Sequence, residues 1–179
     1  MWVGEDTQEY SVRSGYNILN GEYSMQSSES FKLLWSLSAA PSAIVSAWRI
    51  LLDRLPTRLN LGRRGVQLAN PLCPLCQDDV ESNNHLFNTC FVVQQVWDLC
   101  DRWIGKVGVR HQATLVNFQS LCLLGEKQSA NRVWKGMCVA IVLEVWSHRN
   151  KVVFKGGVVD DVEIFSLAQL KGCYGLSTR

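Results

Sequence analysis

The chain has 179 residues, of which 47% are apolar and 19% are charged, and its formal net charge is +2. This length and apolar content suffice for one sizeable core, and so small a net charge by itself indicates no particular partner. The longest apolar run, Met137 to Val145, is interrupted by Glu144 and is too short to span a bilayer. The N-terminal residues contain neither a basic lead nor an apolar run. We therefore expect no signal peptide, no membrane association and a place in the nucleus or cytoplasm rather than secretion.

Residues 1–28 are predicted to form an entry segment followed by a linker. The composition of residues 2–12 favours a short extended stretch. Ser14 is a suitable cap for a short helix that ends at Asn20 and Gly21. The polar residues 24–30 are typical of a flexible link.

Two amphipathic helices are predicted between residues 29 and 55. Phe31, Leu34 and Trp35 recur at helical spacing and predict a helix over Glu29–Leu37. Pro41 then opens a second helix, which we expect over Ser42–Leu55. Its larger apolar residues form one stripe that we expect to face the core, namely Ile44, Val45, Trp48, Leu51, Leu52 and Leu55.

A short third helix is predicted to start at Thr57 and to end at Gly65, a residue that commonly follows a helix C-terminus. Arginines cluster in and before this helix, and we expect them to remain outside the core: Arg54, Arg58, Arg63 and Arg64.

The metal segment, Cys73–Cys90, has the most specific pattern in the chain. It places Cys73, Cys76, His85 and Cys90 at the spacing C-x2-C-x8-H-x4-C. Three thiolates and one imidazole are a ligand set of tetrahedral structural zinc. A helix predicted over Val80–Asn88 lets His85 point back at the Cys-x-x-Cys turn. Because four protein ligands leave no open coordination position, we expect one zinc ion with a structural role.

Other interpretations of these cysteines remain open. A Cys-x-x-Cys pair is also a redox motif, although that motif normally opens a helix in a strand–helix–strand context that is not visible here. The thiols are also compatible with small buried apolar side chains, but that interpretation does not account for His85 between them. Disulfide pairing needs an oxidising compartment, for which the sequence contains no signal.

The remainder of the chain is predicted to be helical. Helices are expected at Phe91–Ile104, Leu115–Leu124, Ala130–Asn150 and Asp160–Leu170. In the first of these we expect six side chains to face inward, namely Val92, Val93, Val96, Trp97, Cys100 and Trp103. The predicted fold class is mostly α: a small helical domain stapled by one structural Cys3His zinc site, with a short extended N-terminal segment. Residues 29–104 form the predicted zinc-binding core, and residues 105–179 form the C-terminal helices.

Four stretches carry a resemblance to a known family: Tyr10–Leu19, Leu33–Val66, Leu72–Trp97 and Val145–Phe154. Together they resemble the zinc-binding region that follows the polymerase in plant non-LTR (LINE-type) retrotransposon reverse transcriptases. The resemblance implies that Cys73, Cys76, His85 and Cys90 bind the zinc and that the parent protein is an RNA-directed DNA polymerase. It further implies polymerase and endonuclease regions before Met1 and an RNase H-like region after Arg179, so we expect a fragment of a longer reading frame.

Two functions compete. In the first, the chain binds RNA or DNA through phosphates, because Arg54, Arg58, Arg63 and Arg64 precede the metal segment and guanidinium groups make bidentate phosphate contacts. These arginines could equally form a solvated helix face or pair with Asp79 and Glu81. In the second, the chain is a structural or protein-interaction domain that packs against a polymerase, or a retroelement remnant with no selected activity. Seven tryptophans and a modest charge favour the second function.

No enzyme is predicted. Asp78 and Asp79 resemble the paired carboxylates that hold Mg²⁺ in polymerases, but they lie inside the metal segment and have no third carboxylate in view. His111 and His148 have no serine or cysteine in a recognisable triad motif. We expect His148 to lie at the surface or to cap a helix, and we expect no small-molecule substrate.

Overall fold

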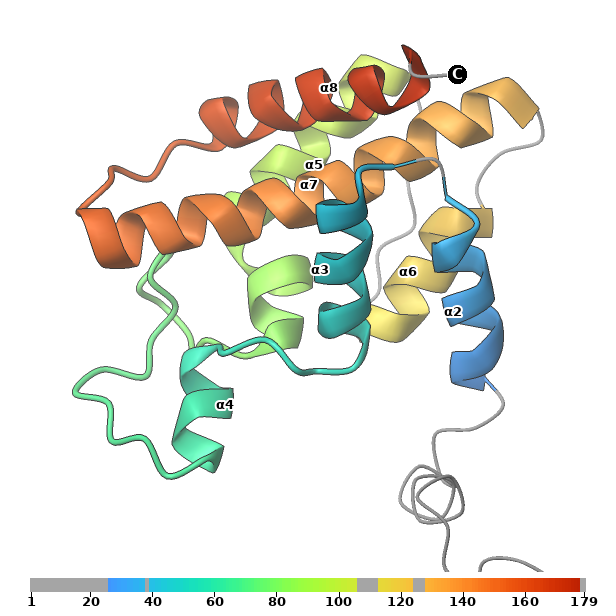
Figure 1. Ribbon diagram of the computed structural model, residues 1–179. Coiled ribbons are helices and arrows are strands. Elements are labelled where there is room, and N and C mark those ends of the chain that lie inside the picture. Colours follow the sequence, from blue (N-terminus) through green and yellow to red (C-terminus); the bar gives the residue numbers. More distant parts are fainter. Residues whose placement is uncertain (1–25, 38, 106–112, 124–127, 178–179) are drawn as a thin grey trace, which may run out of the picture. The chain divides into compact units, whose positions relative to one another are not determined.

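The computed structural model describes residues 26–37, 39–105, 113–123 and 128–177 (Figure 1). These residues contain no strand, only an isolated antiparallel bridge between Leu72 and Val80, so the mostly α fold class is confirmed for them. The helices are α2 (Gln26–Trp35), α3 (Pro41–Leu51), α4 (Arg58–Arg63), α5 (Phe91–Ile104), α6 (Thr114–Leu123), α7 (Gln128–Lys155) and α8 (Asp161–Ser177), with a π-helical turn, η2, at His85–Thr89. The extended stretch expected at residues 2–12 and the helix expected after Ser14 lie outside the described residues.

The chain forms two compact units, Met1–Leu33 and Leu34–Arg179. In the first unit the described residues belong to α2, which starts at Gln26 rather than at Glu29. Part of the stretch expected to be a flexible link is therefore helical. The second unit contains the metal segment and the helices from α3 to α8.

The long helix α7 is the central element of the second unit, where it contacts α3, α5, α6 and α8. Its side chains from Met137 to Ile141 are all buried, so neighbouring elements cover the middle of the helix on every side. Helix α8 runs back along α7 in the opposite direction (Figure 1), after a turn in which Gly156 has a φ of 63°. A Cβ atom on Gly172 of α8 would lie only 3.2 Å from Met137 Sδ, so this glycine permits a close approach of the two helices.

Buried apolar side chains form two groups in the second unit. The larger group joins the metal segment to α5, α7 and α8 and includes Leu86, Val96 and Ile141. The smaller group joins Leu34 and the inner face of α3 to Val139 of α7. A mostly apolar pocket of about 40 Å³ is lined by residues of α3, the metal segment, α5, α6 and α7. No helix among the described residues combines the length and apolarity needed to cross a membrane.

The predicted inward stripe of α3 is partly wrong. The buried residues are Ala43, Ile44, Ala47 and Ile50, whereas Val45 and Trp48 are 43% and 37% exposed. Small side chains allow α3 to pack closely on α7, so the alanines rather than the largest apolar residues mark its inner face. The helix also ends at Leu51 instead of Leu55.

Helix α5 has the predicted bounds and, with one exception, the predicted inner face. Trp103 is 44% exposed, because Cys100 and Asp101 occupy the inward positions of the last turn. Its ring lies edge-on to Phe165 of α8, with 6.5 Å between the ring centroids. Gly105, with a φ of 72°, ends the helix in the left-handed conformation that glycine adopts most easily.

Candidate metal centre

The first two cysteines are held by a short turn stabilised by backbone hydrogen bonds. Cys73 N–H donates to Asp79 O at 2.7 Å, and Gln77 N–H donates to Cys73 O at 2.8 Å. Gln77 has a φ of 58°, a left-handed conformation that reverses the chain directly after Cys76. The thiols of Cys73 and Cys76 therefore point toward the same cluster of side chains.

The other two ligands come from the π-helical turn η2. The helix predicted over Val80–Asn88 is instead an extended stretch followed by a short helical segment, because Val80 forms the bridge with Leu72. Cys90 N–H donates to His85 O at 2.8 Å, the i to i+5 spacing of a π-helix. This wider turn brings His85 and Cys90 to the same side, facing the Cys-x-x-Cys turn.

The four predicted ligands meet at one point. One donor atom from each of Cys73, Cys76, His85 and Cys90 lies within 4.8 Å of all the others. The Sγ atoms of Cys73 and Cys90 are 4.0 Å apart, and Cys76 Sγ is 3.2 Å from His85 Nε2. Zinc–sulfur bonds of about 2.3 Å in a tetrahedron require sulfurs about 3.8 Å apart. The cluster therefore fits one structural zinc ion held by three thiolates and one imidazole.

The thiols of Cys73 and Cys90 shift one another's pKa in opposite directions. The hydrogen bond that Cys73 Sγ donates to Cys90 raises the pKa of the Cys73 thiol, and burial raises it further. The same hydrogen bond lowers the pKa of Cys90. A bound zinc ion would hold both sulfurs as thiolates, since a coordinating thiol is deprotonated.

The orientation of His85 is set by its other ring nitrogen. Nδ1 lies 3.2 Å from Thr89 Oγ1 and 3.5 Å from Asp79 Oδ2, while Nε2 faces Cys76. An Nδ1–H bond to Thr89 Oγ1, with the Asp79 carboxylate nearby, leaves Nε2 as the ligand atom. The Asp79 carboxylate, although its side chain is 67% exposed, therefore lies beside the imidazole of a candidate ligand.

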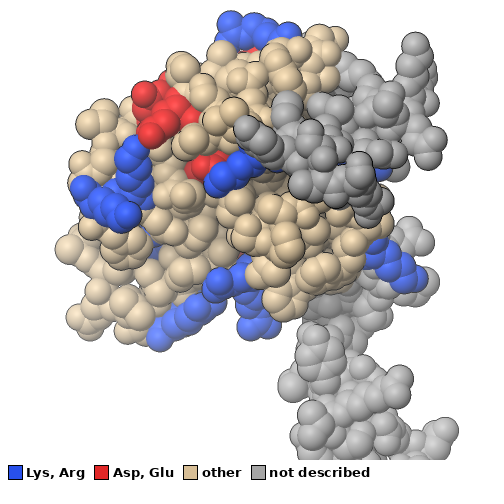
Figure 2. Space-filling view, turned by 45° about the horizontal axis from the view of Figure 1, so that its top comes forward, with Lys and Arg blue, Asp and Glu red and all other residues tan. Residues whose placement is uncertain are grey.

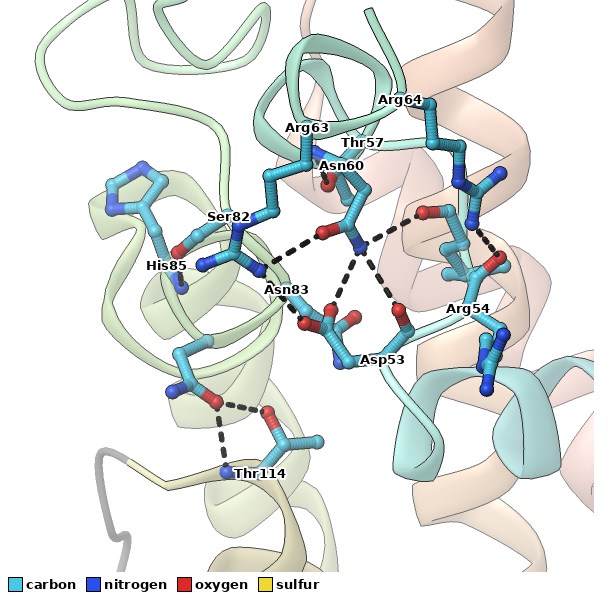
Figure 3. Close-up of polar contacts among 12 residues, drawn as sticks. Asp53, Arg54, Thr57, Asn60, Arg63, Arg64, Ser82, Asn83, His85 and Thr114 are labelled. Atoms are coloured by element: carbon cyan, nitrogen blue, oxygen red, sulfur yellow. Dashed lines mark hydrogen bonds and ion pairs between the residues drawn. The ribbon is translucent and has the colours of Figure 1, made fainter. Parts of the chain in front are cut away.

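Asparagine side chains of the metal segment are also hydrogen-bonded to helices α3 and α6. Asn83 Nδ2 donates to Ile50 O near the end of α3 at 2.6 Å. Asn84 Oδ1 accepts from the backbone N–H of Thr114, the first residue of α6, at 3.1 Å (Figure 3). Asn88 Oδ1 accepts from Asn117 Nδ2 of α6 at 2.9 Å. The metal segment is therefore hydrogen-bonded to both α3 and α6.

A buried ion pair connects the metal segment to the central helix. Arg149 Nε and Nη2 donate to the two carboxylate oxygens of Glu81 at 2.6 and 2.7 Å, and the Glu81 side chain is 0% exposed. The guanidinium group of Arg149 also lies over the Trp146 ring, 4.9 Å from its centroid. Sequence reasoning missed this pair, because the partners are 68 residues apart. The sequence offered one signal for this pair: a glutamate between the ligands Cys76 and His85, and an arginine among the apolar residues of α7.

The four predicted arginines occupy different environments, and three of them, Arg54, Arg63 and Arg64, are labelled in Figure 3. Arg54, Arg63 and Arg64 are exposed and form what we call the arginine corner. Within it, Arg63 Nη1 is 3.4 Å from Asp53 Oδ2, and Arg64 Nη2 donates to Arg54 O at 3.4 Å. Arg58 is partly buried and donates through Nη1 to Leu72 O at 2.6 Å. On the face drawn in Figure 2, basic side chains lie in separate groups rather than in one continuous belt.

The predicted histidines are only partly described. His148 is buried rather than at the surface, and its Nε2 accepts from the backbone N–H of Asp160, just before α8, at 3.2 Å. The surface position expected for His148 is thus wrong, and the residue that caps α8 is Asp160, whose Oδ1 accepts from Glu163 N–H at 2.8 Å. His148 Nδ1 lies 3.4 Å from Glu163 Oε2. His111 lies outside the described residues.

Comparison with known proteins adds one finding. Residues 10–97 match the family described as zinc-binding in reverse transcriptase. No curated protein and no solved structure matches the chain. The matched segment contains all four clustered ligands, so the family and the geometry agree on one structural zinc ion.

Proposed function

Since residues 10–97 belong to the zinc-binding family of reverse transcriptases, we propose that the chain is a non-catalytic accessory module of a retroelement reverse transcriptase that contacts RNA or DNA through phosphates. We place the parent polymerase among the plant non-LTR, LINE-type enzymes and its site of action in the nucleus or cytoplasm. In this proposal the zinc ion is structural, since three thiolates and one imidazole complete its coordination without a water molecule.

The arginine corner is the observation that carries the proposal. Arg54, Arg63 and Arg64 are exposed at neighbouring positions on the turn after α3 and the end of α4. The ion pair of Arg63 with Asp53 is weak competition for a phosphate, since it is 3.4 Å long and both side chains are about half exposed or more, at 62% and 46%. Three guanidinium groups held on a short ordered segment can bind phosphates bidentately.

Salt-dependent binding tests the proposal. The zinc-loaded chain should bind single-stranded RNA and duplex DNA with an affinity that falls steeply with salt, since phosphate contacts release counterions. Arg63→Ala combined with Arg64→Ala should weaken binding and reduce the salt slope by about 1 for each phosphate that is no longer neutralised. The matched control is Arg102→Ala combined with Lys155→Ala, which removes the same charge from exposed positions on α5 and α7. No binding at low salt, or equally weakened binding in both double variants, would contradict the proposal.

A protein-interaction domain is the second candidate, and a different surface favours it. The outer face of α8 exposes Val162, Leu167 and Leu170, at 57%, 38% and 54%. Phe154, at the end of α7, and Val158, in the turn before α8, are also exposed, at 75% and 82%. Such an apolar surface is typical of a site that meets another protein, here a polymerase domain. If Leu167→Gln with Leu170→Gln abolishes binding to a separately produced polymerase domain while RNA binding is absent, this second function holds instead.

A further inference from the structure

Helix α4 carries part of the arginine corner but has little core of its own. It has six residues, and Asn60 is its buried residue. Leu59 and Leu61 are only half-buried. So short a helix does not persist alone in water, because nucleation is costly and few residues propagate it. Its order must come from contacts with other parts of the chain.

Three hydrogen bonds attach α4 to the region of the metal segment. Arg58 N–H, at the first position of the helix, donates to Glu81 Oε2 at 2.8 Å. Leu59 N–H donates to Glu81 O at 3.1 Å, and Arg58 Nη1 donates to Leu72 O at 2.6 Å. Leu72 adjoins the ligand Cys73, and Glu81 lies between the ligands Cys76 and His85. A zinc ion bound by Cys76 and His85 would therefore fix the chain on both sides of Glu81.

Other hydrogen bonds of α4 are made to the turn that precedes it. Thr57 Oγ1 accepts from Asn60 N–H at 3.3 Å, a marginal distance for an N-cap bond. Asn60 Nδ2 donates to Asp53 Oδ1 at 2.8 Å and to Leu55 O at 3.1 Å (Figure 3). These bonds fix the helix to the preceding turn, whereas Glu81 fixes it to the metal centre.

We propose that Glu81 is a positioning residue that holds α4, and with it Arg63 and Arg64, against the zinc-closed loop, so that zinc binding and phosphate contact are coupled. This inference rests on the proposed function for its phosphate part. The coupling itself concerns the order of α4 and is measurable without nucleic acid. Glu81 acts through the backbone N–H of Arg58 and not by touching a phosphate.

The test compares two double variants of the full chain. Glu81→Gln with Arg149→Met keeps an acceptor oxygen for Arg58 N–H, whereas Glu81→Met with Arg149→Met removes it at nearly the same side-chain volume. Both variants lack the buried charges, so neither leaves Arg149 unpaired. Zinc content and amide exchange at Leu61 and Ile141 are measured with zinc and after chelation. Ile141, a fully buried residue of α7, reports on the whole unit.

With zinc bound, we expect Leu61 to exchange about five-fold faster in the Glu81→Met variant than in the Glu81→Gln variant, as when a helix cap is removed. Exchange at Ile141 and zinc content should match between them. Chelation should accelerate amide exchange at Leu61, relative to Ile141, more in the Glu81→Gln variant than in the Glu81→Met variant. The reason is that the hydrogen bond from Arg58 N–H to residue 81 is intact only in the Glu81→Gln variant. Equal Leu61 exchange in both zinc-loaded variants, or an equal response to chelation, would overturn the proposal.

RNA binding separates this inference from the function on which its phosphate part rests. If the wild-type chain binds RNA, the Glu81→Met variant should bind several-fold more weakly than the Glu81→Gln variant at equal zinc content. If the wild-type chain binds no RNA, the proposed function fails while the exchange comparison still decides whether Glu81 positions α4. If the two variants bind RNA equally but differ in Leu61 exchange, Glu81 positions α4, and only the coupling to phosphate contact is overturned.

Discussion

Replacing Arg149 by methionine tests how strongly the buried ion pair holds the metal segment on the central helix. Glu81 is 0% and Arg149 4% exposed, and two short hydrogen bonds of 2.6 and 2.7 Å join them. Arg149→Met leaves the Glu81 carboxylate buried with a charge that no guanidinium neutralises. Removing one partner of a buried pair costs about 3–5 kcal/mol of unfolding free energy. For a chain of this size that cost corresponds to a fall in Tm of about 6–20 °C.

The assay is denaturant unfolding of the zinc-loaded chain, with zinc content measured in parallel. The double variant Glu81→Met with Arg149→Met should lose less stability than Arg149→Met alone, because it buries no unpaired charge. Lys151→Met is the surface control: it removes a pair with Glu163 in which both side chains are more than a third exposed, at 46% and 38%, and should cost about 1 kcal/mol or less. A destabilisation below about 1 kcal/mol for Arg149→Met, or a larger one for the double variant, would refute the reasoning.

Three further predictions concern the metal centre and two glycines. Cys76→Ser should weaken zinc binding at least ten-fold and lower Tm, since structural zinc contributes folding free energy directly; unchanged zinc content and Tm would contradict a Cys3His site. Asp79→Asn should weaken zinc binding by about ten-fold through His85, whereas Asp78→Asn should not, and competition with a chromophoric chelator distinguishes them. Gly62→Ala, with open space around its Cβ position, should stabilise α4 by about 0.5–1 kcal/mol, while Gly156→Ala should destabilise the chain because its φ is 63°. Thermal unfolding measures the direction of both changes in stability, and a higher Tm for Gly156→Ala would contradict the prediction by showing that the turn tolerates a side chain.

Local patterns in the sequence predicted those parts of the structure that depend on neighbouring residues. The bounds of α5 follow from valine and tryptophan spacing up to Gly105, and the start of α4 follows from Thr57 as its N-cap. The four zinc ligands were found because thiols and imidazoles at this spacing have few other uses. In each case a few adjacent residues contain the whole signal.

Features that depend on distant partners were not predicted. The residues around Glu81, Asn83 and Asn84 contain no signal of their bonding partners, which lie 68, 33 and 30 positions away in the sequence. Trp48 and Trp103 are large enough to suggest core positions, although the elements beside them leave both partly exposed. Hydrophobic periodicity locates a helix, but the choice of its inner face depends on which neighbour it meets.

The metal segment explains why polar side chains can occupy the interior of this unit. Glu81, Asn83, His85 and Asn88 are all buried, and a segment with so little regular structure would normally bring unpaired polar groups into the core. Here, each of these side chains makes at least one bond, to a metal ligand, to α3 or α6, or to Arg149, and among these four Asn83 Oδ1 is the buried atom without a partner. Two of the partners, Asn117 and Arg149, lie beyond residue 97, where the family match ends. Glu81 and Asn88 therefore depend on α7 and α6 for buried hydrogen-bond partners, so we expect metal binding and the packing of these helices to stabilise one another.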